Sequence, residues 1–146
     1  MGTWKINPFT LTYDWYEGEP PFPAILFHPE IDITTLNFDS VSPVSMFDLL
    51  VNSIPELVRV IIVTPFNGTA PTLTVGVVGT LNKYVDTMYV DLKGAAKTVY
   101  EVTIGEGAIA GTLESVIATY VADGSSAGSA RIEFHYAANT YGSLMI

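Results

Sequence analysis

The side chains best suited to acid–base or metal chemistry are scarce in this chain. His28 and His135 are the only histidines, and there is no cysteine. Neither histidine has a second ligand at the helical or hairpin spacing that zinc sites use. We interpret Phe27-His28-Pro29 as a loop, and we place His135 on the outward face of the last expected strand. The sequence therefore predicts no metal, no cofactor and no enzymatic activity.

Carboxylates near aromatic residues offer a second kind of chemistry. Asp14, Glu17 and Glu19 lie close to Trp15 and Tyr16, and glycoside hydrolysis uses two carboxylates held roughly 5 or 9 Å apart. A proline-rich segment is a poor scaffold for such a fixed separation. Stacking of a sugar on one of the two aromatic residues is an alternative, and burial of these residues in a neighbouring subunit's pocket is the interpretation that we favour.

A glycine-rich stretch follows one of the expected strands. In residues 105–111 the third glycine comes one position too late for a dinucleotide-binding loop, and Glu106 would repel a phosphate. No strand–helix–strand unit surrounds the stretch, as that class of site requires. We expect an ordinary loop here.

The elements that would position any site are strands. From residue 57 onward apolar residues recur with a period of two, which is typical of strands, and turn-forming residues separate the runs. We expect residues 57–63 to be buried on both faces and to form a hairpin with residues 72–78 through a long loop. This pattern predicts an all-β fold, an antiparallel β-sandwich of jelly-roll-like type. The six expected strands are 57–63, 72–78, 86–92, 98–104, 113–121 and 131–136.

Residues 1–56 differ in composition from residues 57–146, so we expect an N-terminal arm followed by the β-sandwich domain. The first part holds seven of the nine prolines, and its eight acidic residues and one lysine give a net charge of −7. Prolines at this density predict an extended arm. Residues 45–54 fit either a short helix or a strand. The arm's aromatic residues are too apolar to remain in water, and the expected partner-binding residues are Trp4, Trp15, Tyr16, Phe22 and Phe27.

Charge limits the partners of the whole chain. The 146 residues carry a net charge of −9, which opposes binding to nucleic acid and to anionic membranes. Only 14% of the residues are charged, against about 25% in an ordinary soluble protein. This low fraction indicates that other subunits cover part of the apolar surface, and we expect a homo-oligomer.

The order of features between residues 58 and 136 resembles that of small β-sandwich structural proteins in the virions of tailed bacteriophages. The resemblance lies in an apolar strand, in residues 64–71 leading into Leu73-Thr74-Val75-Gly76, in Met88-Tyr89-Val90-Asp91-Leu92, in a strand containing Tyr100, and in residues 127–131 entering the last strand. It covers residues 57–138, leaves the arm outside, and carries no catalytic residue.

The resemblance implies a structural role in the virion. The expectation is a capsid decoration (cement) protein that binds the major capsid protein, or another virion protein, and stabilises the head through its arm. A tail or fibre component that binds a host glycan is the alternative. Lack of cysteine suits a particle that passes from a reducing to an oxidising environment.

Overall fold

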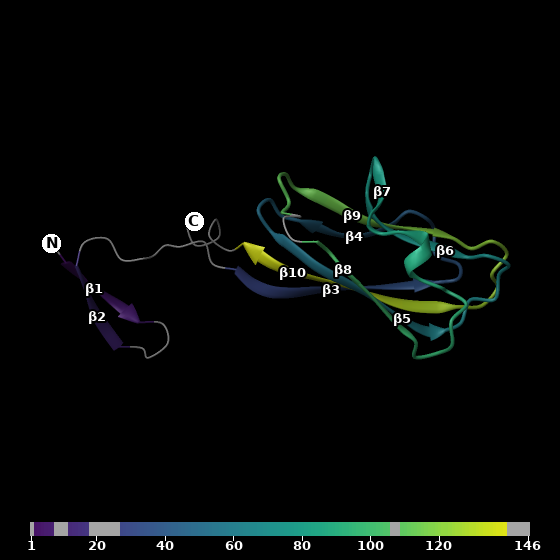
Figure 1. Cartoon of the computed structure of the whole chain (residues 1–146), viewed down its shortest axis with the longest axis horizontal. Coiled ribbons are helices and arrows are strands. Elements are labelled where there is room, and N and C mark those ends of the chain that lie inside the picture. Colours follow the sequence, from purple (N-terminus) through teal and green to yellow (C-terminus); the bar gives the residue numbers. More distant parts are fainter. Residues whose placement is uncertain (1, 8–11, 18–26, 106–108, 140–146) are drawn as a thin grey trace. The chain divides into compact units, whose positions relative to one another are not determined.

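The structure is a computed structural model, and it describes residues 2–7, 12–17, 27–105 and 109–139. The chain divides into two compact units (Figure 1). One unit contains residues 1–26 and 140–146, and the other contains residues 27–139. The second unit is a β-sandwich that holds the whole described hydrophobic core.

Eight strands and one short 3₁₀ helix form the sandwich. Their bounds are β3 (Phe27–Asn37), β4 (Val44–Leu49), β5 (Ile54–Thr64), β6 (Thr72–Val77), β7 (Thr80–Val85), η1 (Thr87–Tyr89), β8 (Val99–Thr103), β9 (Glu114–Val121) and β10 (Ser129–Asn139).

The strands form two antiparallel four-stranded sheets, ordered β3-β10-β5-β8 and β4-β9-β6-β7. The chain moves from one sheet to the other at every connection between successive strands except the one between β6 and β7. This is the arrangement of a jelly roll, in which two Greek keys build an eight-stranded double sheet. The predicted fold class is confirmed.

β10 lies at the centre of the first sheet, between β3 and β5, as Figure 1 shows. Its pairing with β3 extends from Ser129↔Asn37 to Asn139↔Phe27. Ile132 and Phe134 are fully buried and Tyr136 packs against the core, so the alternation predicted for this strand is confirmed. The last strand of the chain thus joins the first and third strands of the sandwich.

β5 is buried on one face only. Val58, Val60 and Ile62 are fully buried in the core, whereas Arg59 and Val63 on the alternate face are partly exposed or exposed. The expectation that this run is buried on both faces is wrong, because no layer of the described structure covers the outer side of the sheet. The expected hairpin with residues 72–78 is also wrong, since β5 and β6 belong to different sheets.

Residues 86–92 do not form the expected strand. The side chain of Asp86 accepts a hydrogen bond from the backbone N–H of Thr87 and begins the 3₁₀ helix η1, as short polar residues do at helix starts. Val90 and Leu92 are nevertheless buried in the core. β7, which immediately precedes this segment, was not expected.

The sandwich begins at residue 27, so it includes β3 and β4, which we expected to belong to the arm. Two prolines of the expected arm lie in strands, Pro29 in β3 and Pro55 in β5, and the position of each explains why the strand tolerates it. Pro29 is in β3, an edge strand, where a missing N–H costs no bond between strands. Pro55 pairs with Tyr136 beside an irregularity in the β5–β10 register. For residues 45–54 a short helix and a strand were both compatible with the sequence, and the first part of this segment forms a strand, β4.

Two loops of the resemblance lie side by side at one end of the sandwich. The side-chain oxygen of Asn67 accepts hydrogen bonds from the backbone N–H groups of Ser126 and Ala127. Gly128, with φ of +143°, faces Phe66 so closely that an added Cβ would lie 2.4 Å from a ring carbon. Only glycine fits this position without displacing the ring.

The unit formed by the N-terminal residues contains a two-stranded antiparallel sheet, β1 (Gly2–Asn7) and β2 (Thr12–Glu17). In this hairpin Trp4 pairs with Trp15 and Ile6 pairs with Tyr13. Residues 2–7 and 12–17 are thus not the simple extended arm that their neighbouring prolines suggested.

Candidate interaction surfaces

The register of the N-terminal hairpin separates its residues into two unlike faces. Residues that pair across an antiparallel ladder share a face, and alternate residues share a face along each strand. One face therefore carries Gly2, Trp4, Ile6, Tyr13, Trp15 and Glu17, and we call it the tryptophan face. The opposite face carries Thr3, Lys5, Asn7, Thr12, Asp14 and Tyr16. Both tryptophans of the chain share one face of the hairpin.

The five residues expected to bind a partner do not all lie together. Trp4 and Trp15 share the tryptophan face, and Tyr16 belongs to the opposite face. Phe27 begins β3, and Phe22 lies outside the described residues. Asp14 and Glu17, considered above as a carboxylate pair, lie on opposite faces of the hairpin by register.

The outer face of the β3-β10-β5-β8 sheet carries most of the charged contacts of the sandwich that involve arginine or histidine. Its residues form three rows across the four strands. In the middle row Ile33 pairs with Glu133, which pairs with Arg59, which pairs with Glu101. The flanking rows are Ile31–His135–Leu57–Thr103 and Thr35–Arg131–Ile61–Val99. We call this surface the arginine face, because it carries both arginines of the chain.

Glu133 is the centre of the arginine face. Its side chain is 10% exposed and contacts three basic side chains: Arg131 Nε at 2.9 Å, His135 Nε2 at 3.2 Å and Arg59 Nη1 at 3.5 Å. Arg59 also binds Glu101, through Nε at 3.2 Å and Nη2 at 2.9 Å, and this hydrogen bond is the main cause of the raised pKa of Arg59. The carboxylate of Glu133 is enclosed, while the Arg131 side chain remains 47% exposed.

Apolar side chains surround this charged centre and are open to solvent. Ile31 and Ile33 on β3 are each 53% exposed, and Val99 on β8 is 50% exposed. These residues lie at the two edges of the sheet, and exposed apolar side chains on one face are typical of protein–protein contacts. The arrangement can hold a flat apolar or aromatic group against arginine side chains.

The two histidines are placed differently from each other. His135 lies on the outer face of β10, as predicted, and contacts Glu133. His28 lies in β3 and not in a loop, with its Nε2 3.0 Å from a carboxylate oxygen of Glu30. Among the residues whose positions are described, no group of three or more potential ligands is placed to hold a metal ion.

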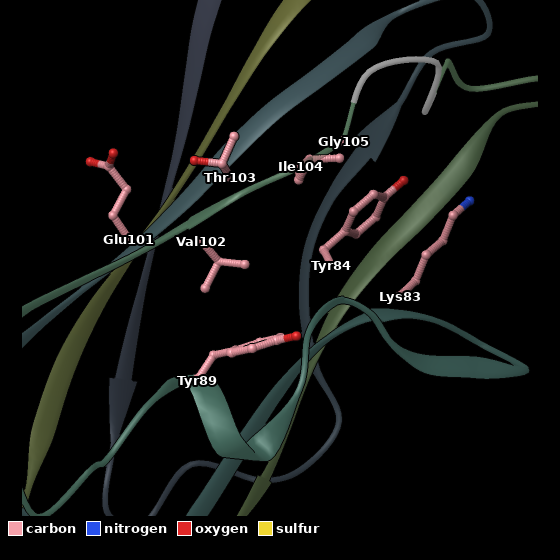
Figure 2. A pocket seen from close by; sticks show the side chains of 8 residues that line it. All are labelled: Lys83, Tyr84, Tyr89, Glu101, Val102, Thr103, Ile104 and Gly105. Carbon is pink, nitrogen blue, oxygen red and sulfur yellow. The ribbon is translucent and has the colours of Figure 1, made fainter.

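A cleft of about 500 Å³ opens between the edge strands β7 and β8 of the two sheets. Figure 2 shows Lys83 and Tyr84 on one side, Glu101 and Thr103 on the other, and the ring of Tyr89 below. Tyr89 is 53% exposed. An exposed aromatic ring among polar groups can bind the flat face of a sugar.

Beside this cleft Glu114 binds two groups of β7. Its carboxylate accepts hydrogen bonds from the hydroxyl of Tyr84 and from Lys83 Nζ. Burial raises the pKa of the Tyr84 hydroxyl, and the bond to Glu114 raises it further. Burial also raises the pKa of Glu114, but the hydrogen bonds from Lys83 and Tyr84 outweigh it, so that this pKa lies below its ordinary value. The cluster connects β9 to β7 within the second sheet.

Of the two clusters of charged side chains, around Glu133 and around Glu114, only the first has a recognisable pattern in the sequence. Arg131, Glu133 and His135 alternate on the outward face of one strand, and Arg59 interrupts an apolar run, but their convergence depends on the pairing of β10 with β5. The cluster of Lys83, Tyr84 and Glu114 joins residues about thirty positions apart and has no local signal.

The fold and these surfaces define a jelly-roll sandwich with an added amphipathic hairpin. Neither a protein-family model nor a curated protein matches the sequence. Among solved structures, a chain from the capsid asymmetric unit of cyanophage Pam1 has a TM-score of 0.59 at 17% identity, covering 84% of this chain and 94% of that one. A chain of the acid-stable capsid of Helicobacter pylori bacteriophage KHP30 has a TM-score of 0.56 at 16% identity, covering 75% and 86%.

At these identities the likeness shows the fold, which is the fold that the sequence resemblance implied. The two similar chains come from structures of phage capsids. In the described part of the chain, no helix is long and apolar enough to cross a membrane.

Proposed function

We propose that this protein is a structural component of a tailed bacteriophage virion, and specifically a capsid decoration (cement) protein. The observation that carries the proposal is the structural likeness to a phage capsid chain over 94% of that chain's length. Because nearly the whole neighbouring chain is matched, the likeness concerns a complete jelly roll and not a shared sheet fragment.

The surfaces of the sandwich are consistent with a binding role in place of catalysis. The charged residues of the arginine face form ion pairs with one another, and the exposed residues around them include Ile31, Ile33 and Val99. Such a surface binds by burial and orientation. The protein is therefore proposed to be non-enzymatic, to form a homo-oligomer, and to bind neither nucleic acid nor membrane.

The N-terminal residues are proposed to make the contacts with neighbouring virion subunits. A two-stranded hairpin is only marginally stable alone in water, so its tryptophan face is expected to be covered in the assembled particle. The contacts are assigned to Trp4, Trp15, Tyr16, Phe22 and Phe27, among which the hairpin register places the two tryptophans together.

Reconstitution with particles of the phage that encodes the protein tests the decoration role. Heads stripped of the protein are mixed with purified chain and sedimented through a density gradient, and bound protein is quantified by mass spectrometry. The full chain is expected to co-sediment with heads, and a chain lacking residues 1–26 is expected to remain in the supernatant. Absence of the chain from purified heads, together with no binding on addition, would contradict the decoration role.

A tail or fibre component that binds a host glycan is the second candidate, and the cleft beside Tyr89 is the observation that favours it. A glycan array distinguishes the two roles. Binding of a host glycan that is lost in Tyr89→Ala and kept in Tyr16→Ala, with the protein found in tails and not in heads, would favour the alternative.

A further inference from the structure

The arginine face is the outer side of its sheet, and no other layer of the sandwich packs on it. The N-terminal hairpin has two strands, and a two-stranded hairpin is only marginally stable alone in water. The tryptophan face holds Trp4, Ile6, Tyr13 and Trp15 by register. Such a face needs a flat partner of roughly its own length, which for six-residue strands is about 20 Å.

The arginine face has the chemistry that such a hairpin requires. Exposed isoleucine and valine side chains flank the centre, and the side chains of Arg59 and Arg131 are 35% and 47% exposed. Guanidinium groups stack on indole rings more favourably than on other aromatic rings. The chain has two tryptophans and two arginines, and each pair is gathered on one of these two surfaces.

The charges of the hairpin and of the arginine face also favour contact between the two surfaces. The strands of the hairpin carry Asp14 and Glu17 against Lys5, a net negative charge. On the arginine face the Glu133 carboxylate is enclosed, whereas Arg131 is nearly half exposed. Toward β3 and β10 the exposed charge of the arginine face is therefore positive, which suits an acidic partner.

From this complementarity we infer that the tryptophan face of one copy packs on the arginine face of a second copy of the same chain. The inference deepens the self-association proposed above and rests on it, but it does not depend on attachment to a capsid. A reciprocal exchange of hairpins gives a closed, symmetric assembly, the kind that most homo-oligomers adopt.

Tryptophan fluorescence reports this contact directly, because both tryptophans lie in the hairpin and the sandwich has none. On dilution of the purified full-length chain, we expect the emission to shift to longer wavelength at the concentration where analytical ultracentrifugation shows the oligomer dissociating. Emission at short wavelength in a monomer at every concentration would mean that the hairpin packs on its own chain, and would overturn the inference.

Two variants remove one surface each. Trp4→Ala/Trp15→Ala removes the tryptophan face, with Thr3→Ala/Asn7→Ala on the opposite hairpin face as its control. Ile31→Thr/Ile33→Thr alters the arginine face while keeping residues that favour strands, and Val41→Thr/Val78→Thr, at positions 86% and 83% exposed, is its control. Each surface variant is expected to raise the dissociation constant at least tenfold, which corresponds to about 1.4 kcal/mol. Each control should keep the wild-type value.

Mixing the two surface variants gives the decisive result. The Ile31→Thr/Ile33→Thr chain keeps its hairpin, and the Trp4→Ala/Trp15→Ala chain keeps its arginine face, so the mixture should associate and shift the emission to shorter wavelength although neither variant does so alone. Failure of the mixture, with both variants folded by circular dichroism, would reject the inference. Head binding measured separately on the same variants would still test the decoration role.

Discussion

Phe134 is the side chain on which most of the aromatic core converges. It is fully buried, and its ring lies edge-on to Phe47 and Tyr84, each with a centroid distance of 5.0 Å, and 6.2 Å from Tyr136. Phe47 comes from β4 and Tyr84 from β7, so this one ring of β10 connects both edges of the facing sheet.

Removing this ring is expected to be costly. Phe134→Ala should lower the free energy of unfolding by about 3–5 kcal/mol, because it leaves a cavity among rings that cannot collapse into it. Urea unfolding followed by circular dichroism measures the change. Val78→Ala, at a position 83% exposed, is the control and should alter the free energy by less than about 0.5 kcal/mol. A small effect of the first substitution would mean that the core repacks.

The cluster around Glu114 predicts a dependence of stability on pH. Since the pKa of Glu114 in the folded chain lies below its ordinary value of 4.5, its ionised form stabilises the fold. That stabilisation is fully present above about pH 4.5 and is lost as the pH falls through the folded value. Glu114→Gln should therefore lower the thermal midpoint at pH 7 and have a smaller effect near pH 3.

The matched control for this pH profile is Glu56→Gln, at an exposed position. This variant should follow the wild-type profile from neutral to acid pH. If Glu114→Gln lowered the midpoint equally at both pH values, the effect would come from packing, and the proposed role of the carboxylate charge would be contradicted.

At the scale of elements, the loop that enters β10 depends on one glycine. Gly128→Ala would place a Cβ 2.4 Å from the Phe66 ring, on a backbone with φ of +143°. We expect it to lower the free energy of unfolding by more than about 1 kcal/mol. Gly105→Ala, where an added Cβ would meet nothing within 4 Å, should be neutral. Chemical unfolding of both variants measures the difference. Equal denaturant midpoints would show that the loop containing Phe66 rearranges at little cost in free energy.

The strands after residue 56 could be predicted because their alternation is local, and five of the six expected segments contain a strand. The remaining segment, residues 86–92, does not form the expected strand, because Asp86 caps a helical turn there. The prolines of β3 and β5 misled the prediction, since the sequence does not show that Pro29 lies at a sheet edge or that Pro55 lies beside a register shift. Strand pairing and the contact of Glu133 with Arg59 depend on tertiary structure, which the local pattern does not contain.

For the whole molecule, the location of the core separates the two units. All described buried apolar residues fall between Leu36 and Phe134. A chain lacking residues 1–26 should therefore keep a cooperative unfolding transition with the wild-type midpoint, measured by calorimetry under conditions where both chains are monomeric. A non-cooperative transition in the shortened chain would show that the sandwich needs the N-terminal residues to fold.

The central place of β10 in the first sheet constrains how the chain can fold. β3 and β5 are synthesised early, but each pairs with β10, which follows about seventy or more residues later along the sequence. Long-range pairings of this kind make folding slow. Until the ribosome has released β10, the backbone edges of β3 and β5 that pair with it remain open, so the nascent chain has a long interval in which chaperones can bind and neighbouring nascent chains can aggregate.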